Sequence, residues 1–180
     1  MLKIVVPGGS FFNELTNEFI DQESVTLELE HSLVSISKWE AIHHKSFLAQ
    51  KTRTPEEQLD YIKCMVITKD VDDSVFYRFT TENYQEIYKY IEEPMSATYI
   101  KKPSNNGRGG DTVTADLIYY WMISFQIPFE CQYWHLNRLL TLIQVCEIKN
   151  GPKNKMSRNE ILRSNAALNA ARRKKYNSKG

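Results

Sequence analysis

The stretch "ADLIYYWMISFQ", residues 115–126, decides the fold class, because apolar side chains fall on nearly every face of the helix that it predicts. A helix that is apolar all round is typically buried on most sides. Ile127-Pro128 ends this helix, and apolar residues at helical spacing continue from Phe129 to about Lys149. We therefore expect two helices, 115–126 and 129–149, to form the centre of the core.

Two helices upstream are predicted from their start signals. Ser37 and Glu40 have the Ser-x-x-Glu spacing of a capping box, which predicts a helix over 38–50. Thr54 is followed by Pro55 and two glutamates, a strong start signal, because the fixed φ of proline and the acidic side chains both suit the first helical turn. The buried face of this second helix is expected to hold Leu59, Ile62 and Val66.

A third upstream helix is predicted over 81–92, where it stops before Pro94, and strands are predicted near the N-terminus. The segment 2–6 is a short β-branched run, and 25–30 alternates strictly between apolar and polar residues. Between them, 11–20 has Phe12, Leu15 and Phe19 at helical spacing and predicts a helix, and 96–102 predicts a short strand.

The segment 102–111, "KPSNNGRGGD", has the composition of a loop within the body. Near the C-terminus, Ser157 and Glu160 again have capping-box spacing and open a last helix with few apolar residues. We expect a mixed α/β body over 1–150 and a basic arm over 151–180. The predicted fold is α+β and predominantly α-helical, with short N-terminal strands, five to six helices and a basic C-terminal helical arm.

Composition limits the classes of protein that fit. The chain has 180 residues, of which 42% are hydrophobic, enough for one core. No apolar run reaches the length of a membrane span, and the first residues do not have the order of a signal peptide. Three scattered cysteines do not make a disulfide framework. We expect a soluble protein that is cytoplasmic when made and has no membrane partner.

Charge is distributed unevenly along the chain. From Lys149 to Gly180 there are ten basic residues and one acidic residue, a net +9, whereas the rest of the chain has 13 basic and 21 acidic residues, a net −8. A nearly neutral total of +1 therefore hides a bipolar molecule. Such a division points to an acidic partner: nucleic acid, a membrane surface or the acidic body of another copy.

Cys131 and His135 are the strongest candidates for a chemical site, because a spacing of four on one helix can present two ligands to a metal or pair a thiolate with its base. The remaining cysteines and histidines do not repeat a ligand spacing, and no third residue orients the pair. A packed thiol beside a hydrogen-bonded imidazole is the expected arrangement. We predict no metal, no cofactor and no catalytic residue.

Other chemical motifs are also weak. His43 and His44 are adjacent, so on a helix they point about 100° apart and cannot face one ion. The glycine-rich run within 102–111 could cradle an anion but lacks the Gly-Lys-Ser/Thr ending of a phosphate-binding loop. Three tryptophans and ten tyrosines remain, and exposed aromatic residues are typical of interfaces. Binding without catalysis is therefore the leading class, although we expect Trp121 and Trp134 to lie mainly in the core.

Three stretches together carry a family resemblance: "SLVSISKWEAIHHKSFL" (32–48), "LIYYWMISFQIPFECQYWHLNRLLTLIQVC" (117–146) and "KNGPKNKMSRNEILRSNAALNAARRKKYNSKG" (149–180). They resemble small tail proteins of tailed bacteriophages that act as tail assembly chaperones or baseplate-hub assembly proteins. The resemblance implies a non-enzymatic protein whose partners are other tail or baseplate proteins and its own copies. It implies the host cytoplasm during assembly, and the virion tail if the protein is retained.

The basic arm then becomes a candidate docking element, which seats a thin apolar stripe in a groove and places its cations against acidic surface. Its expected partner-binding residues are Arg158, Arg163, Leu168, Arg172, Arg173, Lys174, Lys175 and Tyr176. The alternative is a nucleic-acid-binding helix, for which basic residues on one stripe or interleaved aromatic residues would be typical. Here the charges cluster in the final turn, beside a single tyrosine.

Overall fold

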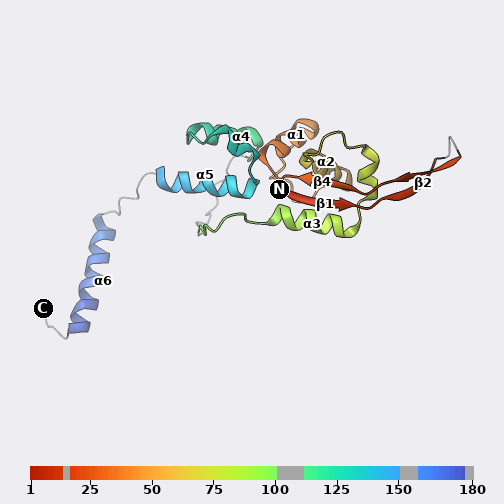
Figure 1. The fold of residues 1–180 in the computed structure, drawn as a ribbon. Coiled ribbons are helices and arrows are strands. Elements are labelled where there is room, and N and C mark those ends of the chain that lie inside the picture. The colour runs from red at the N-terminus through yellow and green to blue at the C-terminus, as the bar shows by residue number, and fades with distance from the viewer. Residues whose placement is uncertain (14–16, 101–111, 151–157, 177–180) are drawn as a thin grey trace. The chain divides into compact units, whose positions relative to one another are not determined.

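The computed structural model describes residues 1–13, 17–100, 112–150 and 158–176 (Figure 1). Contacts divide the chain into two compact units, Met1–Ile148 and Lys149–Gly180, and each is described by itself. The fold is α+β and predominantly helical, as predicted. In chain order its described elements are β1 (Leu2–Val6), β2 (Gly9–Asn13), β3 (Glu18–Gln22), β4 (Val25–Leu29), α1 (Leu33–His43), α2 (Pro55–Met65), the 3₁₀ helix η1 (Asp73–Arg78), α3 (Thr81–Glu92), α4 (Ala115–Ser124), the 3₁₀ helix η2 (Phe129–Tyr133), α5 (Leu136–Asn150) and α6 (Arg158–Tyr176).

The four strands form two antiparallel two-stranded sheets, β1 with β4 and β2 with β3, which follow one another as one ribbon. Val6 of β1 lies opposite Val25 of β4, and three residues away in the sequence on each side Gly9 of β2 lies opposite Gln22 of β3. The two ladders therefore share one register. Leu27 and Leu29 of β4 are fully buried, as their alternation predicts. Figure 1 shows β2 and β3 continuing the ribbon of β1 and β4.

The helix predicted over 11–20 is therefore wrong. Phe12 and Phe19 are cross-strand partners, with ring centroids 5.2 Å apart. A separation of seven residues brings two side chains together on a helix face and also across a hairpin of this length. The spacing alone could not distinguish the two structures, and Leu15 lies outside the described residues.

Gly8 sits where the ribbon changes from one ladder to the next. A Cβ atom added at this position would lie 2.4 Å from the carbonyl oxygen of Gln22. Only glycine lets the two backbones approach so closely, which explains the residue that follows Pro7.

Helix α1 begins and ends earlier than the predicted 38–50. Ser32 is its N-cap, and its side-chain oxygen accepts from the Ser35 N–H at 3.2 Å. His44 ends the helix in the left-handed region, with φ of 53°, and its N–H donates to the Glu40 carbonyl at 2.8 Å. Ser37 lies inside the helix, so the capping box predicted there is wrong.

The predicted capping box fails because the Glu40 side chain bonds to other segments. Its carboxylate accepts from the backbone N–H of Phe47 and from that of Ala115, each at 2.8 Å. It therefore fixes the loop after α1 and the first residue of α4, rather than a cap of its own helix. An acid near a helix N-terminus is also favoured by the helix dipole.

Helices α2 and α3 confirm their predicted starts. Thr54 forms a reciprocal capping box with Glu57 in front of α2, and Thr80 forms one with Asn83 in front of α3. Tyr61, Ile62 and Met65 are the buried residues of α2, so of the face predicted for it only Ile62 is fully buried. The strand predicted over 96–102 is absent from its described part, 96–100, and the loop 102–111 lies outside the described residues.

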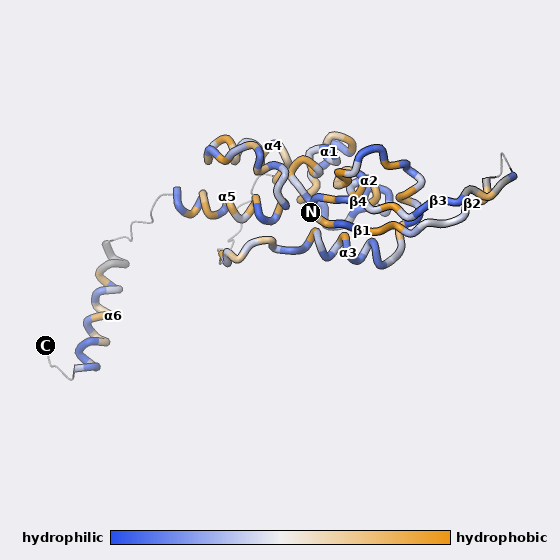
Figure 2. Tube along the Cα trace, viewed as in Figure 1, coloured by the Kyte–Doolittle hydropathy of each residue, from blue (hydrophilic) through white to orange (hydrophobic). Residues whose placement is uncertain are grey.

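The core of the first unit is centred on α1 rather than on the two helices after residue 115. Helix α1 packs against α2, α4 and η2, and its Trp39 is fully buried. Helix α4 is not buried on most sides: it buries Ala115, Ile118 and Met122, whereas Tyr120 and Ile123 are more than half exposed. Only one stripe of this helix is therefore buried, although Figure 2 shows apolar residues, in orange, along it.

Candidate functional site

Cys131 and His135 do not share a helix, which corrects the prediction of one helix over 129–149. Cys131 is buried in η2, and the chain is extended at Trp134 before α5 begins. His135 pairs with Ser32 in an isolated β-bridge, and the Leu136 N–H donates to the His31 carbonyl at 2.7 Å. Pairing with the chain after β4 therefore interrupts the helix.

The His135 ring acts as a structural cap. Its Nδ1 accepts from the Asn137 N–H at 3.3 Å, and its Nε2 lies 2.9 Å from the Tyr90 carbonyl. These partners fix the neutral Nε2–H tautomer, because one nitrogen must accept and the other must donate. Burial lowers the pKa of His135, which favours the neutral ring, and both ring nitrogens have hydrogen-bond partners. Among the described residues, no three His, Cys, Asp or Glu side chains are placed to hold a metal ion.

His31 and Tyr61 form the buried polar pair beside it. His31 is 2% exposed, its Nδ1 hydrogen-bonds the Tyr61 hydroxyl, and its ring lies 4.9 Å from that of His135. Burial, with smaller contributions from His135 and Arg53, lowers the pKa of His31 to about 3. The imidazole is therefore neutral near pH 7.

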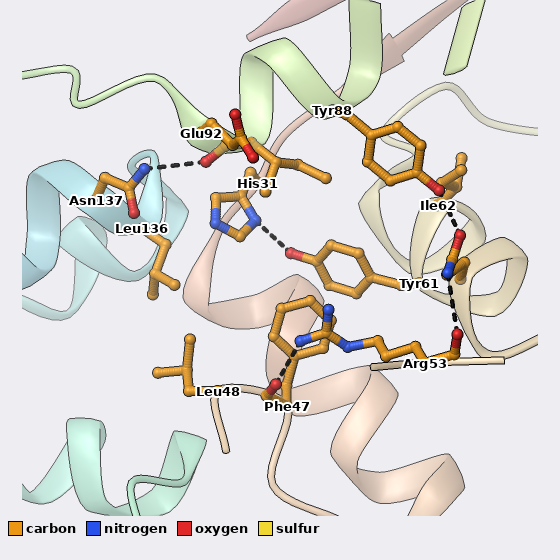
Figure 3. Close-up of a pocket in the computed structure, with 12 residues that line it drawn as sticks. His31, Phe47, Leu48, Arg53, Tyr61, Ile62, Tyr88, Glu92, Leu136 and Asn137 are labelled. Atoms are coloured by element: carbon orange, nitrogen blue, oxygen red, sulfur yellow. Dashed lines mark hydrogen bonds between the residues drawn. The ribbon is translucent and has the colours of Figure 1, made fainter. Parts of the chain in front are cut away.

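A cavity of about 430 Å³ opens beside this pair. It lies between the loop after α1, helices α2 and α3, and the first turn of α5, as Figure 3 shows. The apolar side chains Leu48, Ile62 and Leu136 contribute to its lining, together with neutral polar side chains from α2, α3 and α5. Cavities of this size hold small molecules or single side chains.

Arg53 is the notable residue of the cavity. Its guanidinium carbon lies 3.7 Å from the centroid of the Phe47 ring, and its Nη2 donates to the Phe47 carbonyl. Its own carbonyl accepts from the side chain of Gln58 at 3.0 Å. The Nε is buried and has no hydrogen-bond partner in the described part of the chain. The sequence did not point to this cavity, since its walls come from five separate segments that carry no motif.

The predicted partner-binding residues lie on α6, in the second unit. Every side chain that the structure describes on this helix is exposed, including Leu168 and Tyr176. Arg172, Arg173 and Lys175 follow one another within four residues of the helix, so their exposed side chains spread around it and form no single stripe. The proposed cap at Ser157 lies outside the described residues. Arg158 is the first residue of α6.

Exposed aromatic residues gather on α4 and η2. Tyr120, Phe129 and Tyr133 are each more than half exposed. The two elements are neighbours, since Tyr119 stacks on Phe129 with centroids 6.4 Å apart. Trp121 and Trp134, which were expected mainly in the core, are half-buried at its edge, and Trp134 lies under the Arg138 guanidinium at 3.9 Å.

Two other sequence candidates have structural roles or fall outside the described residues. His43 is the last residue of α1 and His44 its C-cap, so they share no site. The glycine-rich run considered for anion binding lies within 101–111 and is not described.

No family model, curated protein or solved structure matches this chain. No helix in the described ranges has the length and apolar character needed to cross a membrane.

Proposed function

We propose that the chain is a non-enzymatic assembly protein of a bacteriophage tail or baseplate, and that it joins its partners through α6. The observation that carries the proposal is that α6 is a helix of 19 residues with six basic residues, one acidic residue and no buried side chain among those described. The resemblance of the three stretches to tail assembly proteins supplies the biological setting.

Helix α6 forms for local reasons. Alanine, leucine and arginine are among the best helix formers, and 19 residues exceed the roughly 12–15 at which an isolated helix becomes marginal. Glu160 lies near its N-terminus and the cluster 172–175 lies in its last turn, an arrangement that the helix dipole favours at both ends. The basic cluster thus has a structural reason as well as a functional one, and the helix needs no core of its own.

The partner surface that fits α6 is acidic. The chain outside residues 149–180 carries a net −8, so a second copy of the body offers such a surface, as would an acidic tail protein. Exposed leucines on α6 and exposed aromatic residues on α4 and η2 add apolar contact area of the kind that interfaces bury.

The test is neutralisation of the cluster. A variant with Arg172→Gln, Arg173→Gln, Lys174→Gln and Lys175→Gln should lose co-purification with tail proteins and with differently tagged copies of itself. A matched control replaces four exposed body lysines, Lys38, Lys51, Lys69 and Lys89, by glutamine and should assemble normally. Equal assembly of the two variants would contradict the proposal.

The nucleic-acid alternative predicts a different result from the same pair. The C-terminal variant would then lose binding to duplex DNA or RNA, with a reduced salt dependence, while assembly continued. Mass spectrometry of purified virions separates a retained subunit from a chaperone that departs.

A further inference from the structure

Arg53 lines the cavity beside His31, and several N–H donors of its side chain have no acceptor among the described residues. Arginine has five N–H donors, and among the described residues the Arg53 side chain donates only to the Phe47 carbonyl. No carboxylate in the described part of the chain forms an ion pair with it. The nearby Glu57 carboxylate is already used by Lys45 and by the Thr54 N–H, at 2.8 Å and 2.9 Å.

The guanidinium is also held in place before anything binds. The Phe47 ring lies beneath it and the Trp39 ring centroid is 5.9 Å away, so aromatic surface lies beside it. Figure 3 shows it reaching toward the space bounded by His31, Leu48 and Leu136. Fixing an arginine in advance removes part of the entropy cost of binding. Burial lowers the pKa of Arg53, the mark of a cation partly removed from water, although its guanidinium stays charged.

The charge of the lining selects the ligand. His31 is neutral, so Arg53 is the single cation among the described lining residues, and one negative charge balances it. Glu92 also lines the cavity but lies apart from Arg53, across the cavity, in Figure 3. The planar fork of a guanidinium matches a carboxylate or a phosphate with two parallel hydrogen bonds. A single cation balances the one charge of a carboxylate but not the two charges of a phosphate dianion, so the charge of the lining favours the carboxylate.

We propose that this cavity binds a carboxylate carried on a short apolar group, with Arg53 receiving the carboxylate and Leu48, Ile62 and Leu136 contacting the apolar part. A free carboxylic acid and the C-terminal residue of a partner polypeptide share this chemistry. The inference does not rest on α6 or on the function proposed above.

The first test compares two probes on the unaltered full chain. N-acetyl-L-leucine has the carboxylate and the apolar group, whereas N-acetyl-L-leucine methylamide lacks the charge. Titration followed by NMR should shift the Arg53 Nε–H resonance with the acid only, at millimolar concentrations. Equal binding of both probes, or no shift of this resonance, would overturn the proposal.

Variants then assign the contact. Arg53→Gln should weaken binding of the acid at least about tenfold, which corresponds to about 1.4 kcal/mol. Arg53→Lys keeps the charge but loses the fork, and should bind with intermediate Kd. Arg138→Gln, on the surface of α5 outside the cavity, is the matched control and should leave Kd unchanged. If Arg53→Gln does not fold, the lysine variant and the probe pair still decide the question.

A third comparison identifies the source of the carboxylate. A five-residue peptide that ends in leucine with a free carboxylate is titrated beside its C-terminally amidated form. Tighter binding of the free peptide than of N-acetyl-L-leucine supports a polypeptide end, and binding of the small acid alone supports a free metabolite.

Discussion

At the scale of single residues, Glu40 holds together segments that are far apart in the chain. Its two oxygens accept from backbone groups of the loop after α1 and of the first turn of α4. A buried or half-buried N–H that loses its acceptor raises the free energy of the folded state by about 1–3 kcal/mol. One side chain thus carries a share of the stability that its sequence context, an apparent helix cap, does not show.

We predict that Glu40→Ala lowers the free energy of unfolding by about 2–3 kcal/mol, because two N–H groups lose their acceptor. Glu40→Gln should lower it less, since the amide carbonyl retains one acceptor. Chemical denaturation measures both. Glu86→Ala, at an exposed position of α3, is the control and should change little; a loss as large as that of Glu40→Ala would show that the effect is not specific to these bonds.

His31 makes a prediction about pH. Its folded-state pKa of about 3 lies below the unfolded value of 6.5, so the unfolded chain binds more protons between these two values. The stability contributed by the neutral imidazole is therefore present above pH 6.5 and is lost as pH falls from 6.5 toward 3. The free energy of unfolding should fall by at most about 1.4 kcal/mol per pH unit from this group.

Denaturation midpoints between pH 7 and pH 4 measure this loss. A His31→Phe chain, compared with itself across the same range, should show a shallower decline, whereas His44→Ala, at an exposed position, should keep the original slope. An unchanged slope in His31→Phe would assign the acid sensitivity to other groups, His135 among them.

At the scale of elements, the ribbon depends on Gly8. We predict that Gly8→Ala lowers the free energy of unfolding by about 1–2 kcal/mol, because its Cβ would meet the Gln22 carbonyl oxygen and force the two chains apart. Ser24→Ala, at an exposed position between β3 and β4 on the opposite side of the ribbon, is the control. Thermal denaturation followed by circular dichroism measures both, and equal Tm values would show that the ribbon shifts freely to accept the methyl group.

Local signals predicted the helices whose starts are coded within one turn. Thr54, Pro55 and the two glutamates after them predicted the start of α2, and the run 81–92 matched α3 residue for residue, because start signals and apolar stripes are properties of nearby residues. The strands at 2–6 and 25–30 were also predicted, since alternation of apolar and polar residues indicates which face of a strand is buried.

Errors arose where a distant segment decided the outcome. Glu40 bonds to Phe47 and Ala115, and His135 pairs with Ser32, so neither follows the helix signal of its neighbours. Phe12 and Phe19 fit both a helix and a hairpin. The cavity at Arg53 could not be predicted for the same reason, because it exists only once α2, α3 and the start of α5 have come together. The helix at 158–176 could be predicted, because its signals are local.

At the scale of the whole molecule, we infer from the uneven charge that the acidic body folds by itself and that the basic C-terminal segment serves assembly. We predict that a chain ending at residue 156 keeps the Tm and the circular dichroism of a folded body but no longer joins tail partners or its own copies. The reason is that the first unit has a hydrophobic core built from its own residues, and the described side chains of α6 are exposed. Size-exclusion chromatography and co-purification measure the two properties.

Assembly of the full chain should also weaken as salt rises, because exposed charges are screened over about 8 Å at physiological ionic strength. A truncated chain that unfolds would place the C-terminal segment in the core. One that assembles normally but no longer binds DNA or RNA would favour the nucleic-acid function.

The pairing of His31 and Ser32 with His135 and Leu136 bears on how the chain folds during synthesis. The ribbon and helices α1 to α3 leave the ribosome first. The His31 carbonyl, however, accepts from the Leu136 N–H, which is synthesised about a hundred residues later. Contacts between segments so distant in sequence form late, because the entropy of closing the long loop must be overcome first. A ribosome-bound chain that stops at residue 100 should therefore remain sensitive to protease, and resistance should appear only when α5 has emerged.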